Sequence, residues 1–335
     1  MSARAFTRLT DLAQPRLGGA VVFATDDFFG DKSRLIAPSE PVFIPDKYDD
    51  HGKWMDGWES RRRRDSGHDY CIVKLGRPGK VAGFEIDTRH FTGNYPPAAS
   101  IDACSCNLET PDESANWETL VERVALKGDD RRFIEVDDDR VWTHVRLVIY
   151  PDGGVARLRV YGRVHMDWNA VGADTLIDLA AMEFGGRTVA CNDEHFGRLD
   201  NLIAPGRGVN MGDGWETRRR REPGHDWAVI ELAHPGTIEQ IVIDTAHFKG
   251  NYPDRCSIQA TGAAPGGDEA IGAAAETWPV LLPEQKLDAD REHLFTEAIV
   301  AHKPVRYVRL NIYPDGGVSR LRLFGRIAAG AKDQG

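Results

Sequence analysis

A stretch of the sequence that occurs twice dictates the domain organisation of this chain. Residues 56–70 (DGWESRRRRDSGHDY) recur with few changes as residues 213–227 (DGWETRRRREPGHDW), an offset of 157 positions (213 minus 56). The same offset relates IDTRHFTGNYP (86–96) to IDTAHFKGNYP (243–253) without a gap. Solenoid repeats have periods of only ~20–50 residues, so each copy here should be a complete domain.

The matching segments extend over most of the chain, and loops of different length separate them. VRLVIYPDGGVARLRVYGR (145–163) matches VRLNIYPDGGVSRLRLFGR (308–326). The first copy carries an insertion at 39–53, where the second has only 206–210. Such variation is typical of surface connections. The sequence therefore predicts a first repeat at 1–163, a linker at 164–175, a second repeat at 176–328 and a C-terminal tail at 329–335.

Hydrophobic alternation predicts that both copies are built of β-strands. In 70–75 (YCIVKL) and 227–232 (WAVIEL) every second residue is apolar, as in a strand with one buried face. About eight short runs of this kind occur per copy, separated by turns such as GRPGK (76–80). Helical periodicity is confined to 174–183 and part of 286–300. We therefore expect an all-β chain of two tandem jelly-roll β-sandwich domains related by internal duplication.

The amino-acid composition limits which cellular compartment and which kinds of partner we expect for this chain. The formal net charge of −10 argues against a general binder of nucleic acid or anionic membranes, although the arginine runs 61–64 and 218–221 are locally basic. No apolar stretch reaches the ~20 residues of a membrane span, and the N-terminal residues lack the apolar core of a secretory signal. The 5 cysteines are odd in number and mostly unmatched between the copies, as is typical of reduced thiols. We expect a cytoplasmic protein without nucleic-acid or membrane partners.

The repeated motifs resemble those of a known enzyme family. The tandem DGWE[ST]RRRR..GHD, IDT.HF.GNYP and YPDGG..RLR..GR is similar to the allantoicases, which are built of two galactose-binding-domain-like jelly rolls, and the resemblance covers about residues 10–328. It implies that the chain hydrolyses the small molecule allantoate to ureidoglycolate and urea in purine degradation. It also implies a homo-oligomer, such as a trimer or hexamer.

The substrate implied by this resemblance sets requirements that the motifs meet. Allantoate carries one carboxylate and two ureido arms on a single carbon, so its site needs guanidinium groups, amides, and a base and an acid near the reacting carbon. The candidate catalytic residues are His68, His225, His90, His247, Glu59 and Glu216. The candidate substrate-binding residues are Arg61, Arg63, Arg218, Arg220, Asn94, Asn251, Tyr95 and Tyr252.

Structural roles compete with these assignments. If 61–64 form a strand, alternate arginines point to opposite faces, and part of the run is only surface. Trp58 and Trp215 are most simply core residues. Arg157 and Arg320 project away from an apolar strand face, so we expect them to meet solvent or another subunit.

Metal ligation is weakly indicated, and the repeated motifs predict no metal site and no cofactor. His68 and Asp69 are neighbours that would point to opposite faces of a strand, and Cys104 with Cys106 offers too few ligands for zinc. A divalent ion held by residues from distant loops, such as His90, Asp87 and His144, stays open as an alternative.

The duplication leaves the place of the site open. One site per copy, one composite site between the copies, and a duplicated scaffold with one working copy are all compatible with the repeat. The alternative function is a non-catalytic tandem jelly-roll protein that binds carbohydrate or another small polar ligand. Because the shared polar residues are cationic and imidazole rather than mainly aromatic, they favour a small anionic substrate.

Overall fold

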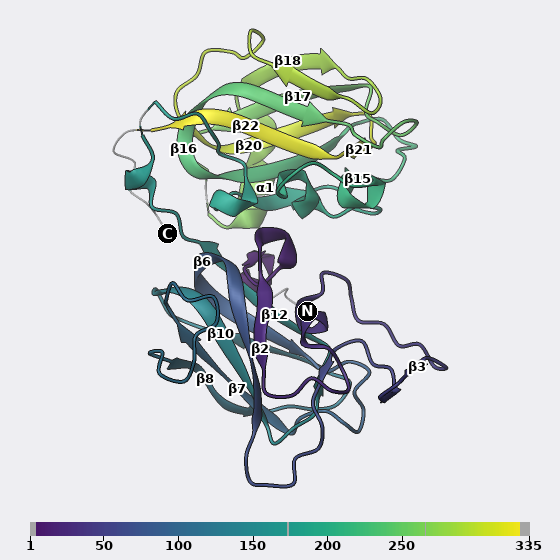
Figure 1. Cartoon of the computed structure of the whole chain (residues 1–335). Helices are drawn as coiled ribbons and strands as arrows, with labels where there is room; N and C mark the ends of the chain where they lie inside the picture. The colour runs from purple at the N-terminus through teal and green to yellow at the C-terminus, as the bar shows by residue number, and fades with distance from the viewer. Residues whose placement is uncertain (1–4, 173, 265, 329–335) are drawn as a thin grey trace. The chain divides into compact units, whose positions relative to one another are not determined.

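The computed structural model describes residues 5–172, 174–264 and 266–328. Its contacts divide the chain into two units, Met1–His165 and Met166–Gly335, and each is described by itself (Figure 1). The division falls inside the segment expected as a linker, and the exact domain boundaries stay predictions. The fold is all-β, as predicted: within the described residues the α-helix is the short α1 (Asp268–Ala274). None of the described helices is long and apolar enough to cross a membrane.

The first unit is an antiparallel sandwich. Its strands are β1 (Thr10–Asp11), β2 (Ala20–Ala24), β3 (Tyr48–Asp49), β4 (Gly52–Lys53), β5 (Trp58–Glu59), β6 (Asp69–Asp87), β7 (Ala98–Cys104), β8 (Glu118–Ala125), β9 (Arg131–Glu135), β10 (Val141–Tyr150), β11 (Gly154–Val155) and β12 (Arg157–Val164). Its 3-10 turns are η1 (Ala5–Arg8), η2 (Pro15–Leu17) and η3 (Lys32–Ile36). The strand order is β1-β12-β6-β10-β7-β8, and β2 and β9 also pair with β6.

The second unit repeats this topology strand by strand. Its strands are β13 (Ile177–Asp178), β14 (Arg187–Cys191), β15 (Trp215–Glu216), β16 (Asp226–Asp244), β17 (Arg255–Thr261), β18 (Val280–Lys286), β19 (Glu292–Phe295), β20 (Val305–Tyr313), β21 (Gly317–Val318) and β22 (Arg320–Ile327). Its 3-10 turns are η4 (Trp168–Ala170), η5 (Met182–Phe184), η6 (Leu199–Ile203), η7 (Met211–Asp213) and η8 (Ala275–Thr277). The order β13-β22-β16-β20-β17-β18, with β14 and β19 on β16, confirms the internal duplication.

One long strand joins the two layers of each sandwich. The first half of β6 pairs with β2 and β10, where Lys74 lies opposite Ala20 and His144. The second half pairs with β9 and β12, where Glu85 lies opposite Phe133 and Arg159. The predicted turn at 76–80 is therefore wrong, because this segment continues strand β6. It forms hydrogen bonds with neighbouring segments; for example, the Pro78 carbonyl accepts from the backbone N–H of His165.

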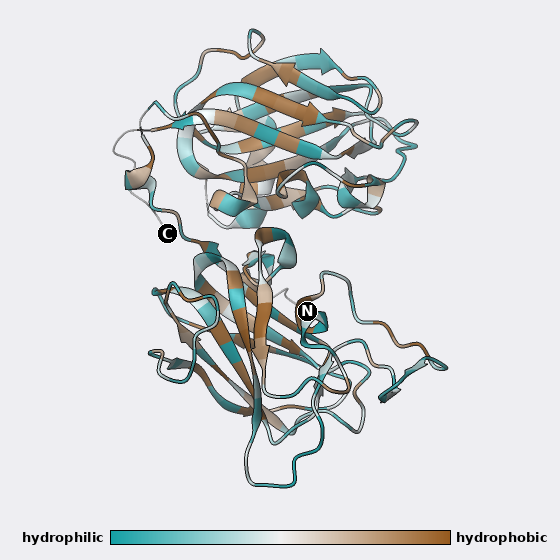
Figure 2. Cartoon of the chain, viewed as in Figure 1, coloured by the Kyte–Doolittle hydropathy of each residue, from teal (hydrophilic) through white to brown (hydrophobic). Residues whose placement is uncertain are grey.

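The core of each unit lies between these layers. In unit 1, Phe84 and Ile86 from the second half of β6 pack in one cluster with Ile101 of β7 and Leu147 of β10. Each such side chain contributes about 1.5–3 kcal/mol when it leaves water. Figure 2 shows the hydrophobic colour concentrated on the strands, while the connecting loops are largely hydrophilic.

Each unit buries one tryptophan completely, as predicted for Trp58 and Trp215. The Trp58 indole Nε1–H donates to the carbonyl of Asp26 (2.8 Å), and that of Trp215 donates to the carbonyl of Asp193 (2.9 Å). The indoles thereby fix the loop after β2 and the loop after β14 to the core.

Trp58→Phe should lower the free energy of unfolding by about 1–3 kcal/mol, because it leaves the Asp26 carbonyl without its donor and removes ring volume. Trp215→Phe should cost a similar amount, and Tyr48→Phe, at an exposed position, should stay within about 0.5 kcal/mol. Urea denaturation of the three variants measures this. Equal losses in all three would contradict the proposed anchoring role.

Three local predictions are wrong. The apolar segment 174–183 forms no α-helix: Ile177–Asp178 pair with β22, and the Asp178 carboxylate accepts from the amides of Ala180 (3.1 Å) and Leu323 (2.9 Å). The segment 286–300 contains strand β19 instead of a helix. The run 61–64 lies outside any strand, because β5 ends at Glu59. In each case contacts with distant segments override the local pattern.

Candidate active site

A cavity of about 450 Å³, lined by both polar and apolar groups, lies in unit 2 beside the start of β16. The chain leading into β16 and the strand itself form one wall, β20 forms another, and α1 with η8 closes a third. The lining residues are Asn192, Arg220, Gly224, His225, Trp227, Gly272, Ala273, Glu276 and Arg309. The structure thus brings together two of the predicted residues, Arg220 and His225, with groups that the sequence did not single out.

Arg309 is the most unusual group in this cavity. Its side chain is only 4% exposed, and its guanidinium lies over the Trp227 ring at 4.9 Å. Its Nε donates to Asn311 Oδ1 (2.8 Å). Burial lowers the pKa of Arg309 from its ordinary value, with an opposing effect of the Glu276 charge, yet a guanidinium stays protonated. Within the described part of the chain no carboxylate forms an ion pair with it.

Arg220 supplies a second guanidinium that is only partly satisfied. Its Nη1 donates to Asp226 Oδ1 (2.7 Å), which also accepts from Asn192 Nδ2 (2.7 Å). Its buried Nε and the buried Asp226 Oδ2 have no partner among the described residues. A buried polar atom without a partner costs about 1–3 kcal/mol, so such atoms favour a ligand or ordered water.

The hydrogen bonds of His225 fix its tautomer. Its Nε2 lies 3.2 Å from Asn311 Oδ1. The Asn311 amide is oriented because its Nδ2 donates to Ser257 Oγ (3.2 Å) and Gln259 Oε1 (3.0 Å). Since Asn311 Oδ1 can only accept, His225 Nε2 carries the hydrogen, and Nδ1 holds the lone pair that can take up a proton.

Unit 1 has arginines at the equivalent positions, but they are neutralised. Arg146, which corresponds to Arg309, pairs with Asp102 at 2.8 Å. Arg63, which corresponds to Arg220, pairs with both Asp65 (2.9 Å) and Asp69 (2.8 Å). The two guanidiniums of unit 1 therefore have three carboxylates close to them.

Two exchanges between the repeats distinguish the two sites, one beside the buried arginine and one beside the histidine. Gln259 occupies the position of Asp102, since each lies opposite the corresponding arginine in the sheet register. Asn311 corresponds to Val148, so the partner that orients His225 has no counterpart beside His68. His68 is exposed, and its ring contacts Tyr150 at 5.3 Å between centroids.

A second set of predicted residues forms one pair in each unit, and neither pair belongs to the cavity lining. Asn94 Nδ2 donates to Glu59 Oε1 (2.7 Å), and Asn251 makes the same bond to Glu216. Both glutamates end the short strands β5 and β15, which pair with β11 and β21. Burial raises the pKa of Glu59, and the hydrogen bond from Asn94 partly offsets this.

Glu59→Gln should change how stability depends on pH. Because the folded-state pKa of Glu59 lies above its ordinary value of 4.5, the contribution of the protonated carboxyl is fully present below pH 4.5 and is lost as pH rises through the folded-state pKa. Glutamine keeps the acceptor for Asn94 and does not titrate. Urea denaturation across this range should show wild type losing stability relative to E59Q as pH rises. A difference that does not change with pH would contradict the raised pKa.

The first arginine of each run makes a local ion pair. Arg61 contacts Asp26 (2.6 Å), and Arg218 contacts Asp193 (2.9 Å). Although burial acts in the opposite direction, hydrogen bonds from Arg61 lower the pKa of Asp26. Both arginines are largely exposed, so the structure places them outside the cavity lining.

The histidines of the HF.GNYP motifs hold loops. His90 and His247 both have a positive φ of 72°. His90 Nε2 lies 3.1 Å from the Pro41 carbonyl, and His247 Nε2 lies 2.8 Å from that of Gly208. The tyrosines of the same motifs are half-buried: Tyr95 packs against a cluster containing Phe91, and Tyr252 lies at the equivalent position of unit 2.

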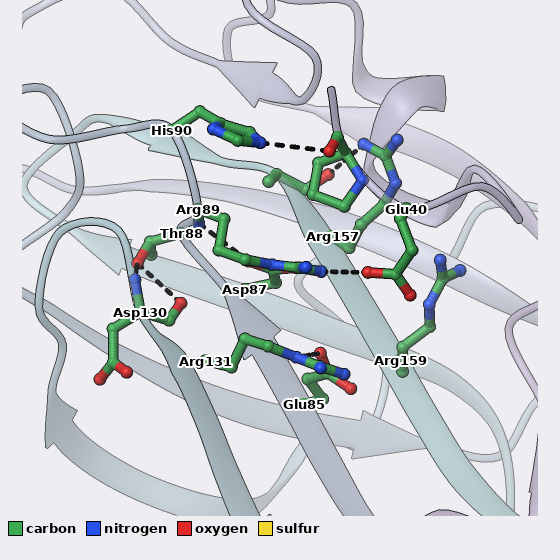
Figure 3. Close-up of polar contacts among 12 residues, drawn as sticks. Glu40, Glu85, Asp87, Thr88, Arg89, His90, Asp130, Arg131, Arg157 and Arg159 are labelled. Carbon is green, nitrogen blue, oxygen red and sulfur yellow. Dashed lines mark hydrogen bonds and ion pairs between the residues drawn. The ribbon is translucent and has the colours of Figure 1, made fainter. Parts of the chain in front are cut away.

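Around His90, arginines and carboxylates form a network that the sequence did not predict (Figure 3). Arg89 joins Asp87 (2.6 Å) to Glu40, and Arg131 pairs with Glu85 (2.6 Å). Burial opposes the change, but the hydrogen bond from Arg89 and the charges of Arg131 and Arg159 lower the pKa of Glu40. Unit 2 differs here, because Arg207 takes the position of Glu40 and pairs with Asp244 (2.9 Å).

The expectation that Arg157 and Arg320 meet solvent or another subunit is wrong. Arg157 is 1% exposed, and it donates to the Ser39 carbonyl (2.9 Å) and to Asp56 (2.8 Å). Arg320 is equally enclosed and donates to the Gly206 carbonyl (3.1 Å) and to Asp213 (2.8 Å). The loop after η3 in unit 1, and its equivalent in unit 2, covers this face, and the buried guanidinium donates to its carbonyls.

Known proteins match this chain over nearly its whole length. The allantoicase repeat family matches residues 10–165 and 177–328. The chain is 56% identical over 328 residues to "Probable allantoicase 2" of Burkholderia pseudomallei, covering 98% of each chain. It is 54% identical to a probable allantoicase of Pseudomonas aeruginosa, covering 96% of each chain. The crystal structure of allantoicase from Saccharomyces cerevisiae is 36% identical, with a TM-score of 0.80 over 96% of this chain and 95% of the yeast chain.

Proposed function

This chain belongs to the allantoicase family, and from that premise we propose that it hydrolyses allantoate to ureidoglycolate and urea. In this reaction the bond between the central carbon and one ureido nitrogen breaks, and a hydroxyl from water takes its place. The departing nitrogen takes up a proton and leaves as urea. The site must therefore hold a carboxylate, two ureido arms and a group that moves protons.

The observation that carries the site assignment is Arg309, a buried guanidinium with no carboxylate of its own in the described chain, facing a cavity that Arg220 also lines. A substrate carboxylate would supply the missing counter-charge. Guanidinium groups bind carboxylates through two parallel hydrogen bonds, and Arg220 adds a second positive charge to the same lining. The cavity therefore suits a compact anion.

His225 is the group that we assign to proton transfer. With its hydrogen on Nε2, its Nδ1 can accept a proton from water as the C–O bond forms and deliver one to the departing nitrogen. Asn192 and the exposed Glu276 lie on the same lining and suit the ureido N–H and C=O groups. Of the three arrangements that the repeat allows, this proposal selects a duplicated scaffold with its working site in the second copy. The catalytic and binding roles predicted for residues outside this cavity stay predictions.

We infer that the reaction in this cavity needs no metal ion. Its lining contributes one imidazole and one carboxylate, and the single group of three metal-ligating side chains found in the described residues belongs to unit 1. Activity should therefore persist after treatment with a chelator. Loss of turnover that is restored only by a divalent ion would contradict this inference.

We further infer a cytoplasmic homo-oligomer, such as a trimer or hexamer. The exposed apolar side chains Val42, Phe43, Ile44 and Tyr48 gather in the insertion that only the first repeat carries. Contiguous apolar side chains at a surface are typical of an assembly interface. Light scattering on the purified chain tests the oligomer, and a monomer at micromolar concentration would contradict it.

The function is tested by incubating the purified chain with allantoate and following the release of urea. Steady turnover supports the proposal. Binding of allantoate or of a sugar without any turnover would instead favour a non-catalytic binding protein.

A further inference from the structure

Two cysteines and a histidine meet in unit 1, at the sheet edge where β7 ends. Cys104 is the last residue of β7, and His144 lies directly opposite it on β10. Cys106 follows two positions later in the chain. One ligand atom from each of the three side chains lies within 4.8 Å of the others. Two soft sulfur donors and an imidazole form the ligand set that thiophilic ions such as Zn²⁺ prefer.

The local hydrogen bonds hold these donors in place. The backbone N–H of Cys106 donates to Thr143 Oγ1 (3.0 Å), which folds the chain after β7 back over β10. His144 Nδ1 lies 3.8 Å from Cys106 Sγ. In a tetrahedral zinc site, bonds of about 2.3 Å to sulfur and about 2.0 Å to nitrogen separate the donor atoms by roughly 3.5–3.8 Å. The distance between His144 Nδ1 and Cys106 Sγ matches this spacing, and the three ligand atoms, all within 4.8 Å of one another, need to close by at most about 1 Å around an ion.

Burial adds a second observation. His144 and Cys104 are both only 1% exposed, and His144 Nε2 is buried without a hydrogen-bond partner among the described residues. On the other side of the ring, His144 Nδ1 lies 2.8 Å from Thr143 Oγ1, which fixes the orientation of the imidazole. Nearby, the Lys74 side chain pairs with Glu109, whose charge acts on His144. Glu109 or a water can supply a fourth ligand, since a zinc ion needs four.

The second repeat shows that the fold does not require this cluster. In the equivalent register, Thr261 lies opposite Tyr307, where unit 1 has Cys104 opposite His144. Ala263 takes the place of Cys106. Tyr307 instead packs with Trp278 in a small apolar cluster. The three ligands are thus a special property of unit 1 and not a requirement of the sandwich.

We propose that Cys104, Cys106 and His144 bind one thiophilic divalent ion, Zn²⁺ in the first instance. The site does not depend on the cavity of unit 2 or on the reaction proposed there. It ties the loop after β7 to β10, so its effect is on the stability of unit 1.

Cobalt titration of the reduced, metal-free full-length chain tests this proposal, because Co²⁺ bound to thiolate sulfur gives a charge-transfer absorption that other ligands do not. The native chain should develop this absorption up to about one ion per chain, and Zn²⁺ should abolish it by displacement. C106A should lose it. C191A, which removes a half-exposed cysteine of unit 2, should keep it.

A second variant controls for the possibility that C106A loses the absorption because it misfolds. C104T/C106A/H144Y gives unit 1 the residues that the second repeat carries at the same positions, so it should fold and bind no Co²⁺ through sulfur. Absence of the thiolate absorption in the native chain would overturn the proposal. So would equal absorption in C106A, or a Cys104–Cys106 disulfide that persists in reductant and blocks the ion.

Discussion

A His225→Gln chain is expected to lose about 10²- to 10⁴-fold in kcat for allantoate, the usual contribution of a positioned general acid or base. Glutamine can still donate to Asn311 from its side-chain amide, so the pocket keeps its shape, but it has no lone pair that takes up a proton at neutral pH. Since the substrate carboxylate is held by the arginines, KM should change little. Steady-state urea release measures both constants.

His68→Gln is the matched control for this variant. His68 occupies the same place in the first repeat and packs on Tyr150 as His225 packs on Tyr313, but Val148 stands where His225 has Asn311. We therefore expect kcat within about twofold of wild type. If H68Q were as inactive as H225Q, each copy would carry a site. If both variants retained full activity, His225 would have no part in proton transfer.

The fold could be predicted from the sequence because strands leave a local pattern of apolar residues and because the same motifs occur in the same order in both copies. Apolar alternation in 70–75 and 227–232 marks the inner face of β6 and β16, and the repeat requires that both copies fold alike. The predictions that failed concern segments whose conformation depends on pairing with strands distant in the sequence. Residues 76–80 form strand because β10 and β12 pair with Gly79 and Lys80. The segment 174–183 forms no α-helix because Ile177–Asp178 pair with β22, which also supplies a donor to the Asp178 carboxylate.

Only part of the candidate site could be predicted from the sequence, again because contacts between distant segments determine it. Arg220 and His225 stand in the repeated motif and were predicted, but a motif shared by both copies does not indicate which copy works. The two copies differ at single positions far from the motif: Asp102 is replaced by Gln259, and Val148 by Asn311. The effect of these exchanges on the arginine and the histidine can be seen only once the strand register is known. Likewise, Cys104 and Cys106 gain a third ligand only through pairing with β10.

Arg309→Gln should raise KM for allantoate about 10- to 100-fold with a smaller effect on kcat. A hydrogen bond to a charged group contributes about 1.5–3 kcal/mol, and every 1.4 kcal/mol is a factor of ten in affinity. The loss should fall on binding because the carboxylate is the same in substrate and transition state. Arg146→Gln, the equivalent change in unit 1, removes an arginine already paired with Asp102 and should leave KM unchanged. Equal effects of the two changes would contradict a site confined to unit 2.

Gln259→Asp tests the same idea without removing the arginine. It gives Arg309 the carboxylate that Arg146 has in Asp102, at the same register position. If the lack of this counter-charge is what makes Arg309 a carboxylate site, Q259D should raise KM as R309Q does, because substrate must compete with an internal carboxylate for one guanidinium. If Q259D folds and binds allantoate as wild type does, Arg309 does not contact the substrate carboxylate, and the role assigned to it is wrong.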